Sequence, residues 1–265
     1  MGQVQLMRFS LRHFTEVLDV RNKQGTPLIL IGGQAVNYWA ELYSAQEPSL
    51  AKWRPFTSED IDFQGTRADV RLIASQLGLT PVFPRPVEMT ALAGMIPFKR
   101  GDLKSQIEVV SSVPGVPAKL IQQTALEATW ETHHIRVIDP ISLLCAKARL
   151  ALKVPQKGRR DADHLAIMVL CVRAFLRGAL RKVEAGSLPA RNWLAAMERV
   201  LALAESTAGA GTARKFGTDW TEALPVKEIE SCVTSQIVSF RDRRLPRLKA
   251  KIGSFIGSAA SSTGS

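Results

Sequence analysis

The stretch Pro27-Leu28-Ile29-Leu30-Ile31-Gly32-Gly33-Gln34-Ala35-Val36 decides how the first half of the chain folds. Its apolar start has the composition of a strand that is buried on both faces. Gly32 and Gly33 stop this strand, and glycines let the backbone approach a ligand closely. The helical pattern of Gln34–Tyr43 follows, and a helix N-terminus favours phosphate oxygens. A tight strand-to-helix turn also requires glycines, so the pair alone leaves both interpretations open.

A second signal lies in Ser58-Glu59-Asp60-Ile61-Asp62-Phe63, where acidic and apolar residues alternate. Residues two apart on a strand point to the same face, so Asp60 and Asp62 are expected side by side. Neighbouring carboxylates repel each other, and a bound Mg²⁺ ion, which prefers carboxylate, water and phosphate oxygens, compensates that repulsion. A solvated strand end is the alternative explanation of this pattern.

A third acidic residue, Glu108, stands in the otherwise apolar end of the strand pattern Gln106–Val110. In a sheet whose faces are covered, such an acid needs a partner. We expect it to join Asp60 and Asp62 in one metal site. An exposed position, or an ion pair with Lys104 or Arg100, is the alternative.

The remaining periodicities predict an α/β (α+β) chain, with a mixed sheet flanked by helices and then a C-terminal helical domain. Strand patterns stop at Asp139-Pro140, so we predict domains over 1–139 and 140–252, then a disordered Ser/Gly/Ala-rich tail over 253–265. Residues 45–57 and 209–217 are expected to be loops. Helices are predicted over Phe9–Gln24, Arg67–Leu77, Ile141–Leu152, Arg160–Lys182, Pro189–Ala204 and Val226–Leu245, and further strands over Thr80–Phe83, Ala91–Phe98 and Ile135–Ile138.

The charge is unevenly distributed along the chain. The net charge is +11, and the whole excess lies after residue 135. A basic half suggests a polyanionic partner, most often nucleic acid, although a helical domain with Lys- and Arg-rich faces has the same charge. The densest cluster is Arg241, Arg243, Arg244, Arg247, Lys249 and Lys251; the next candidates are Arg159, Arg160, Arg173 and Arg177.

The expected compartment follows from three further features. Three widely spaced cysteines make neither a disulfide framework nor a zinc pattern. The first residues lack the apolar core of a signal peptide, and no apolar run is long enough to span a membrane. We therefore expect a cytoplasmic protein without membrane association.

The order of strand, Gly-Gly, helix, Asp-x-Asp strand, helix and acidic strand resembles the nucleotidyltransferase superfamily, which includes the DNA polymerase β-like transferases. The matching residues are Ile31–Ala35 and Ser58–Phe63. Within the superfamily, the chain resembles the minimal nucleotidyltransferases related to the AbiEii toxins of bacterial abortive-infection and toxin–antitoxin systems. That likeness lies in Val137–Pro140, Leu143–Lys147 and Arg159–Leu165, and the whole resemblance covers residues 28–170.

The resemblance implies transfer of a nucleoside monophosphate from an NTP to an RNA acceptor, tRNA included, or to a protein acceptor. It also implies a toxin with a cognate antitoxin protein. Two Mg²⁺ ions, or Mn²⁺ in their place, are then held by Asp60, Asp62 and Glu108, and the amides of Gly32 and Gly33 hold the triphosphate. The family has a lysine at the position of Lys147, and the resemblance implies that Lys147 neutralises the leaving pyrophosphate.

Several assignments remain open at the level of the sequence. Lys99 and Arg100 are alternatives to Lys147, and Asp161 either caps the helix that follows or orients Lys147 through an ion pair. A catalytically silent fold that binds nucleic acid or a protein partner is the second hypothesis. An antibiotic nucleotidyltransferase is the third, and the charge disfavours it because aminoglycosides are themselves polycations.

Overall fold

The structure is a computed structural model that describes residues 8–85, 87–88, 90–101, 103–155, 159–247 and 250. Its contacts divide the chain into two compact units. The first contains Met1–Leu42 and Ala51–Ala146, and the second contains Tyr43–Leu50 and Lys147–Ser265. The divisions fall inside α2 (Gly32–Tyr43), shortly after it, and inside α5 (Pro140–Lys153), so the second unit is not contiguous in sequence.

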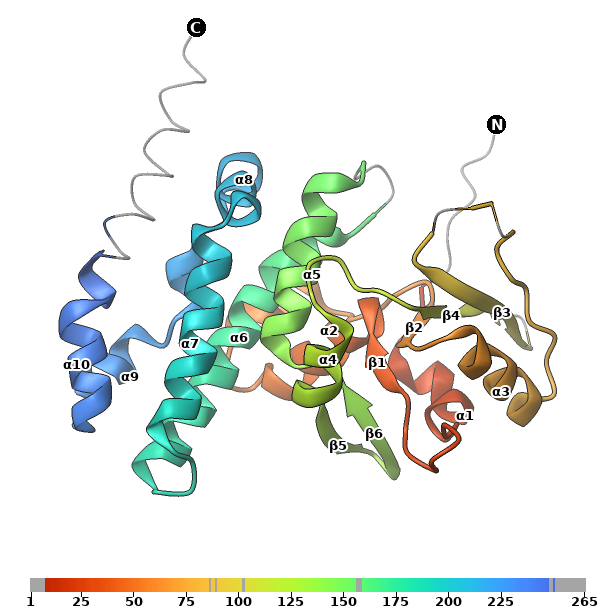
Figure 1. The fold of residues 1–265 in the computed structure, drawn as a ribbon, viewed down its shortest axis with the longest axis horizontal. Helices are drawn as coiled ribbons and strands as arrows, with labels where there is room; N and C mark the ends of the chain where they lie inside the picture. Colours follow the sequence, from red (N-terminus) through yellow and green to blue (C-terminus); the bar gives the residue numbers. More distant parts are fainter. Residues whose placement is uncertain are drawn as a thin grey trace, which may run out of the picture. The chain divides into compact units, whose positions relative to one another are not determined.

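The first unit is built on a six-stranded mixed sheet, which confirms the predicted α/β class (Figure 1). The strand order is β3-β4-β2-β1-β6-β5. β1 pairs antiparallel with β2 and parallel with β6, while β2 pairs parallel with β4. The strands are β1 (Ile29–Ile31), β2 (Ile61–Gln64), β3 (Leu92–Arg100), β4 (Leu103–Val110), β5 (Leu126–Trp130) and β6 (His133–Val137).

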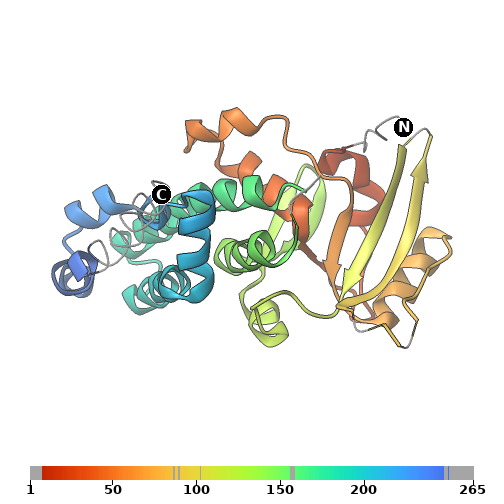
Figure 2. The ribbon, with the colours of Figure 1, turned by 90° about the horizontal axis from the view of Figure 1, so that it is seen from above.

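One face of this sheet packs against the N-terminal helices η1 (Leu11–Phe14) and α1 (Thr15–Leu18) and against α3 (Arg67–Leu77). Figure 2 shows α3 running beside the long β3–β4 hairpin. The Phe14 and Phe98 rings lie 5.9 Å apart, and Ile61 pairs with Ile107, both fully buried. The residues that alternate with Ile61 and Ile107 therefore point to the opposite face.

Two predictions for the first unit are wrong. The helix expected over Phe9–Gln24 ends at Leu18, because the Asn22 side chain accepts hydrogen bonds from the amides of Gln24 and Thr26 and folds the chain into a turn. The strand expected over Thr80–Phe83 is a single bridge between Val82 and Met95.

Three elements in the first half of the chain were not predicted. The 3₁₀ helix η2 (Pro48–Trp53) occupies part of the expected loop, and α4 (Ala118–Thr124) and β5 precede the predicted strand β6. β5 forms a hairpin with β6, pairing Leu126 with Val137. Its exposed and half-buried residues alternate, so β5 lacks the continuous apolar run that made β1 conspicuous.

The second unit is helical, and α6 (Asp161–Glu184) is its central element. α6 packs against α7 (Ala190–Glu205) and the 3₁₀ helix η3 (Trp220–Ala223), and α7 packs against α8 (Thr207–Phe216). Two fully buried indoles fix this packing: Trp193 donates to the Leu176 carbonyl on α6 at 2.9 Å, and Trp220 donates to the Gly209 carbonyl on α8 at 3.0 Å. None of the helices in the described ranges combines the length and apolar character needed to cross a bilayer.

Two predictions for the second unit are also wrong. The loop expected over 209–217 is the helix α8, whose first turn is capped by the Ser206 hydroxyl accepting from the Gly209 amide. The single helix expected over Val226–Leu245 is two, α9 (Val226–Ser231) and α10 (Ser235–Arg243), separated where Cys232 has extended backbone. The predicted tail over 253–265 and the basic residues Lys249 and Lys251 lie outside the described residues.

Candidate metal centre

Strand register brings the second and third acidic residues together. β2 and β4 are parallel neighbours, and Asp62 is the register partner of Glu108. Ile61 and Ile107, one residue earlier on each strand, are buried on the helix-covered face, so the two carboxylates share the opposite face. Residues 46 positions apart in sequence thus become neighbours through sheet pairing alone.

Asp60, Asp62 and Glu108 form one cluster. Each contributes a carboxylate oxygen, and these oxygens all lie within 4.8 Å of one another. All three side chains are half-buried. The Ser58 hydroxyl donates to Asp60 at 3.3 Å, and the Gln106 amide donates to Glu108 at 2.6 Å, so both outer carboxylates are oriented by a neighbour on their own segment. The predicted convergence of these three acids is confirmed.

The chemistry of this donor set fits a divalent cation. Three carboxylates held this close repel one another unless positive charge lies between them. Mg²⁺ and Mn²⁺ prefer oxygen ligands and commonly bind through a few carboxylates, with substrate and water completing the shell. All three side chains are only partly buried, so their carboxylates are not closed off from such additional ligands.

Gly32 sits against Asp62 and starts α2. Ile31, the last residue of β1, pairs with Asp62, which places the following glycine beside the aspartate side chain. Gly32 has a φ of +66°, and a Cβ atom there would lie 1.8 Å from Asp62 Oδ2. Only glycine fits this position, both for its backbone conformation and for the space. The sequence predicted the turn, and the structure adds that Gly32 makes room for a carboxylate of the cluster.

Three buried polar side chains hold α2 in place. Gln34 donates to the Phe9 carbonyl at 3.0 Å, Asn37 donates to the Gln34 side chain at 3.1 Å, and the Trp39 indole donates to the Ile138 carbonyl at 3.0 Å. Gly33, next to Gln34, is buried in the first turn. Sequence reasoning missed Gln34 and Asn37, although two amides in an otherwise apolar helix were the available signal.

Lys147 lies in the second unit, where it is buried and paired with Asp161. Lys147 Nζ lies 3.2 Å from Asp161 Oδ1, and Arg159 Nε lies 2.7 Å from Asp161 Oδ2. Burial disfavours the charged Asp161 carboxylate, but Lys147 and Arg159 outweigh burial, so the pKa of Asp161 is lowered. Of the two roles predicted for Asp161, the structure shows the ion pair, and the N-cap position of α6 is occupied by Arg160.

The other basic candidates are placed differently. Lys99 is exposed on β3, and the side chain of Arg100 lies outside the described residues. Of these basic candidates, Lys147 is buried in an ion pair with Asp161, whereas the Lys99 side chain is exposed to solvent.

A mixed sheet with three converging carboxylates beside a glycine-initiated helix defines the site at the level of its class: an acidic cluster on one face of a sheet that could hold a metal ion. Comparison with protein-family models and with curated proteins found no match to this chain.

Proposed function

We propose that the chain is a Mg²⁺-dependent nucleotidyltransferase that transfers a nucleoside monophosphate from an NTP to an RNA or protein acceptor. The observation that carries this proposal is the cluster of Asp60, Asp62 and Glu108, with ligand oxygens within 4.8 Å of one another beside the start of α2. A structural acidic cluster needs no glycine-initiated helix next to it. A phosphate-transfer site can use both features, the cluster for the cation and the helix N-terminus for phosphate oxygens.

In this proposal, one set of residues in the first unit binds the cation and another binds the triphosphate. Asp60, Asp62 and Glu108 would hold the cation, which supplies Lewis-acid stabilisation of charge at the α-phosphate. The amides of Gly32 and Gly33, at the N-terminus of a twelve-residue helix, donate hydrogen bonds to triphosphate oxygens. Gly32 has no side chain, so the triphosphate can approach both these amides and Asp62.

Lys147 has a separate place in the proposal. The resemblance to the nucleotidyltransferases implies that Lys147 neutralises the leaving pyrophosphate. Its ammonium group pairs with Asp161 at 3.2 Å, and we assign Asp161 the role of positioning it. The same proposal includes the role of a toxin neutralised by an antitoxin protein, in the cytoplasm.

Label transfer tests the proposal directly. The protein is incubated with each α-³²P-labelled NTP, Mg²⁺ and either total cell RNA or total cell protein, and the labelled species identifies the acceptor. Asp60→Asn, Asp62→Asn and Glu108→Gln are each expected to reduce transfer by about 10³-fold or more, because each removes a ligand of the cation that stabilises the transition state.

Glu59→Gln is the matched control. Glu59 directly precedes Asp60 but lies outside the cluster, and its side chain pairs with Arg8 at 3.8 Å on the surface. This variant is expected to keep wild-type transfer. Absence of transfer with every NTP, together with retained binding of RNA or of a protein partner, would instead establish the silent binding module.

A further inference from the structure

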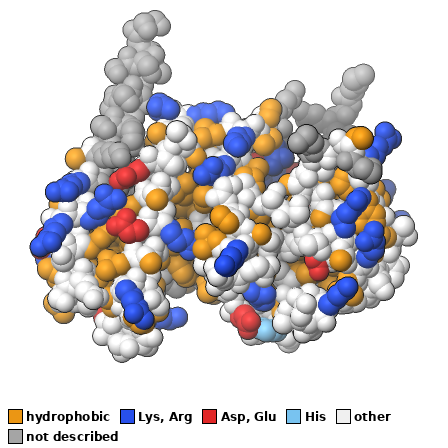
Figure 3. Space-filling view, viewed as in Figure 1, with side chains coloured by type: hydrophobic (Ala, Val, Ile, Leu, Met, Phe, Trp, Pro, Cys, Tyr) orange, Lys and Arg blue, Asp and Glu red, His pale blue; other side chains and the backbone are white. Residues whose placement is uncertain are grey.

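The basic residues of the second unit fall into two groups, those paired with acids and those that make no ion pair within the described chain. Figure 3 shows Lys and Arg side chains spread over the displayed face, several of them along its upper edge. The paired group contains most of the residues that the sequence singled out as nucleic-acid contacts. Their pairing decides which surface is available to a polyanion.

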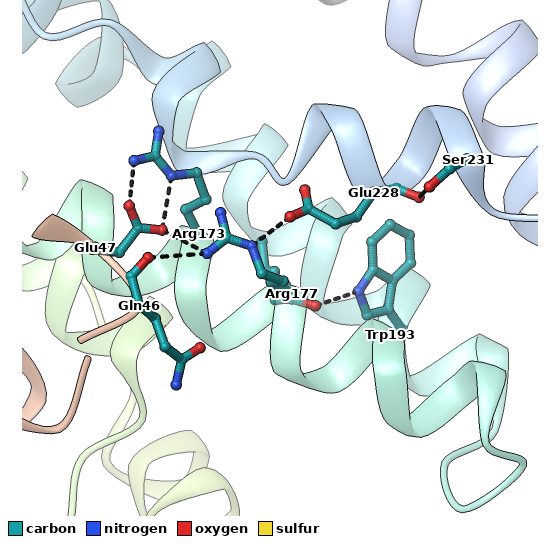
Figure 4. Close-up of polar contacts among 8 residues, drawn as sticks. Gln46, Glu47, Arg173, Arg177, Trp193, Glu228 and Ser231 are labelled. Atoms are coloured by element: carbon teal, nitrogen blue, oxygen red, sulfur yellow. Dashed lines mark hydrogen bonds and ion pairs between the residues drawn. The ribbon is translucent and has the colours of Figure 1, made fainter. Parts of the chain in front are cut away.

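The arginines of α6 are committed to internal ion pairs. Glu47, only 3% exposed, accepts from Arg173 Nε at 3.0 Å and from Arg177 at 3.1 Å (Figure 4). Arg177 also donates to Glu228 on α9. These contacts tie Tyr43–Leu50 and α9 to α6 within the second unit. Moving either arginine to a phosphate would remove one of the two partners of the buried Glu47 carboxylate, which is costly.

The predicted C-terminal cluster is partly neutralised in the same way. Arg241 pairs with Asp242 at 2.8 Å and also donates to the Glu230 carbonyl. Arg244 lies 3.5 Å from Glu198 and 3.7 Å from Glu205. Arg159 and Arg160 are likewise paired, with Asp161 and Asp163.

A second set of basic residues differs from these. Arg149 and Lys153 on α5, and Arg214 on α8, make no ion pair with another described residue, and Lys215 rests over the Phe216 ring at 5.1 Å. We call Arg149, Lys153, Arg214 and Lys215 the α5–α8 patch. Neither α5 nor α8 contains an Asp or Glu.

These four residues surround one helix contact. A Cβ atom on Gly211 of α8 would lie 2.8 Å from the Leu152 side chain of α5, so the two helices touch there. Arg214 and Lys215 follow Gly211 by three and four positions, which puts them one turn further along the same side of α8. Lys153 follows Leu152, and Arg149 precedes it by one turn.

Two features of the patch are unfavourable in the protein alone. Arg149 and Lys153 are like charges at i,i+4 on one helix, an arrangement that destabilises a helix. Arg149 Nε is buried and has no hydrogen-bond partner among the described residues. A bound anion would relieve the repulsion between Arg149 and Lys153.

We propose that the α5–α8 patch binds the phosphate backbone of an RNA. The choice of RNA rests on the proposed function, in which RNA is an acceptor. A protein partner normally needs buried apolar or aromatic anchors. The large hydrophobic residues that are exposed in the described chain, Leu42, Val82, Val87 and Val233, lie on neither helix. A nucleic-acid backbone needs cations without apolar anchors, which is what the patch offers.

Fluorescence anisotropy with a fluorescein-labelled single-stranded RNA of about 20 nucleotides, over a range of salt and without NTP, tests the patch. Arg214→Glu/Lys215→Glu is expected to weaken binding about tenfold or more and to flatten the log–log salt slope by about 1.4, for two lost phosphate contacts. Far-UV circular dichroism verifies the fold, and Arg214→Gln/Lys215→Gln replaces the double variant if that variant unfolds.

Arg181→Glu/Lys182→Glu is the matched control. Both residues are exposed in the last turn of α6, so the variant has the same change in net charge at another helix end. It is expected to bind RNA nearly as well as the wild type. Equal weakening by both double variants, or no weakening by the patch variant, overturns the proposal, as does a wild-type protein that does not bind RNA.

Two further measurements distinguish RNA binding by the patch from general anion binding and from the proposed nucleotide transfer. Polyglutamate or single-stranded DNA that displaces the RNA at equal charge concentration would show that the patch does not select RNA. Asp62→Asn is expected to bind RNA like the wild type, because the patch does not use the carboxylate cluster. If the protein binds RNA through the patch but transfers no nucleotide, the proposed function is wrong and the RNA-binding patch is supported. If the protein transfers nucleotide to RNA and Arg214→Glu/Lys215→Glu leaves this transfer and RNA binding unchanged, the patch is wrong and the proposed function is supported.

Discussion

At the scale of single residues, the close approach of Gly32 to Asp62 controls the shape of the acidic cluster. The backbone conformation at Gly32 disfavours any side chain, and the aspartate occupies the space that a Cβ atom would need. The two constraints can be separated, because Gly78 has the same φ of +66° but open space where its Cβ atom would lie, with nothing within 4 Å.

Gly32→Ala and Gly78→Ala are therefore a matched pair. Both are expected to lose about 1–2 kcal/mol of unfolding free energy, from the left-handed backbone. Gly32→Ala alone is expected to lose Mn²⁺ binding, by about tenfold or more in affinity, because the new methyl group displaces the Asp62 carboxylate. Isothermal titration calorimetry measures the binding. Equal Mn²⁺ affinity in the two variants would show that Asp62 is not a ligand.

The buried pair of Lys147 and Asp161 predicts a specific dependence on pH. The pKa of Asp161 is lowered from its ordinary value of about 3.9, so its stabilising contribution is complete above that value and is lost as the pH falls through the lowered pKa. Asp161→Asn leaves Lys147 buried without its main partner, and is expected to cost about 3 kcal/mol at neutral pH.

The difference in stability between the wild type and Asp161→Asn should begin to close as the pH falls below about 4 and should vanish only below the lowered pKa of Asp161, where the wild-type carboxyl is neutral as well. Urea unfolding at a series of pH values measures it. Asp163→Asn, on an exposed pair with Arg160, serves as the control and should differ little from the wild type at any pH. A difference that does not change with pH would mean that the Asp161 charge is not the cause.

At this scale the sequence predicted the acids but not what surrounds them. Asp60 and Asp62 are recognisable because period-two alternation fixes their common face, and Glu108 because it interrupts an apolar run. Gln34 and Asn37 were not recognised, because a buried amide is identified by its partners, and the Phe9 carbonyl is distant in sequence. The pairing of Lys147 with Asp161 was foreseen only as one of two alternatives for Asp161.

At the scale of elements, apolar periodicity located the main strands and helices, and glycines caused the largest error. Gly209 and Gly211 made α8 look like a loop, since glycine is a poor helix former. Both positions are required by packing: a Cβ atom on Gly209 would lie 2.3 Å from the Ala204 and Leu203 carbonyls, and Gly211 faces Leu152. A single sequence does not distinguish a glycine that ends a helix from one that lets two helices meet.

Glycine substitutions in two helices test whether packing requires glycine at position 209. Gly209→Ala is expected to destabilise the protein by about 1–3 kcal/mol, because backbone carbonyls cannot move aside cheaply. Gly178→Ala, inside α6 with nothing within 4 Å, is expected to stabilise it by about 0.5–1 kcal/mol. Thermal and urea unfolding give both values, and a loss of stability in both variants would contradict the packing explanation for Gly209.

At the scale of the whole molecule, the second unit takes part of its structure from early in the sequence. Tyr43–Leu50 belongs to it, and Glu47 from this segment is buried between Arg173 and Arg177. The polar segment Tyr43–Leu50 did not indicate in sequence that it belongs to the second unit, because its buried ion pairs depend on arginines that are far away in sequence. The predicted limit at residue 139 was drawn from the change in periodicity, which reports local structure and not long-range contacts.

Glu47→Gln tests how far the second unit depends on this segment. The variant is expected to unfold about 3 kcal/mol more easily and to lose amide protection in α6, since two arginines lose their shared carboxylate. Hydrogen exchange followed by mass spectrometry locates the change. Glu41→Gln is the control, because Glu41 forms an exposed pair with Arg54 at 3.6 Å and should leave α6 protected. Unchanged protection in Glu47→Gln would show that the segment is only peripheral.

The parallel pairing of β1 with β6 also has a consequence for how the protein is made. Leu30 pairs with Val137, so β1 must wait for nearly the whole of its unit to leave the ribosome before its second edge is covered. All three residues of β1 are buried in the finished sheet, and until then they form an apolar, unpaired edge of the kind that aggregates. Translation speed and chaperone supply, more than the final stability of the sheet, should therefore determine the yield of folded protein.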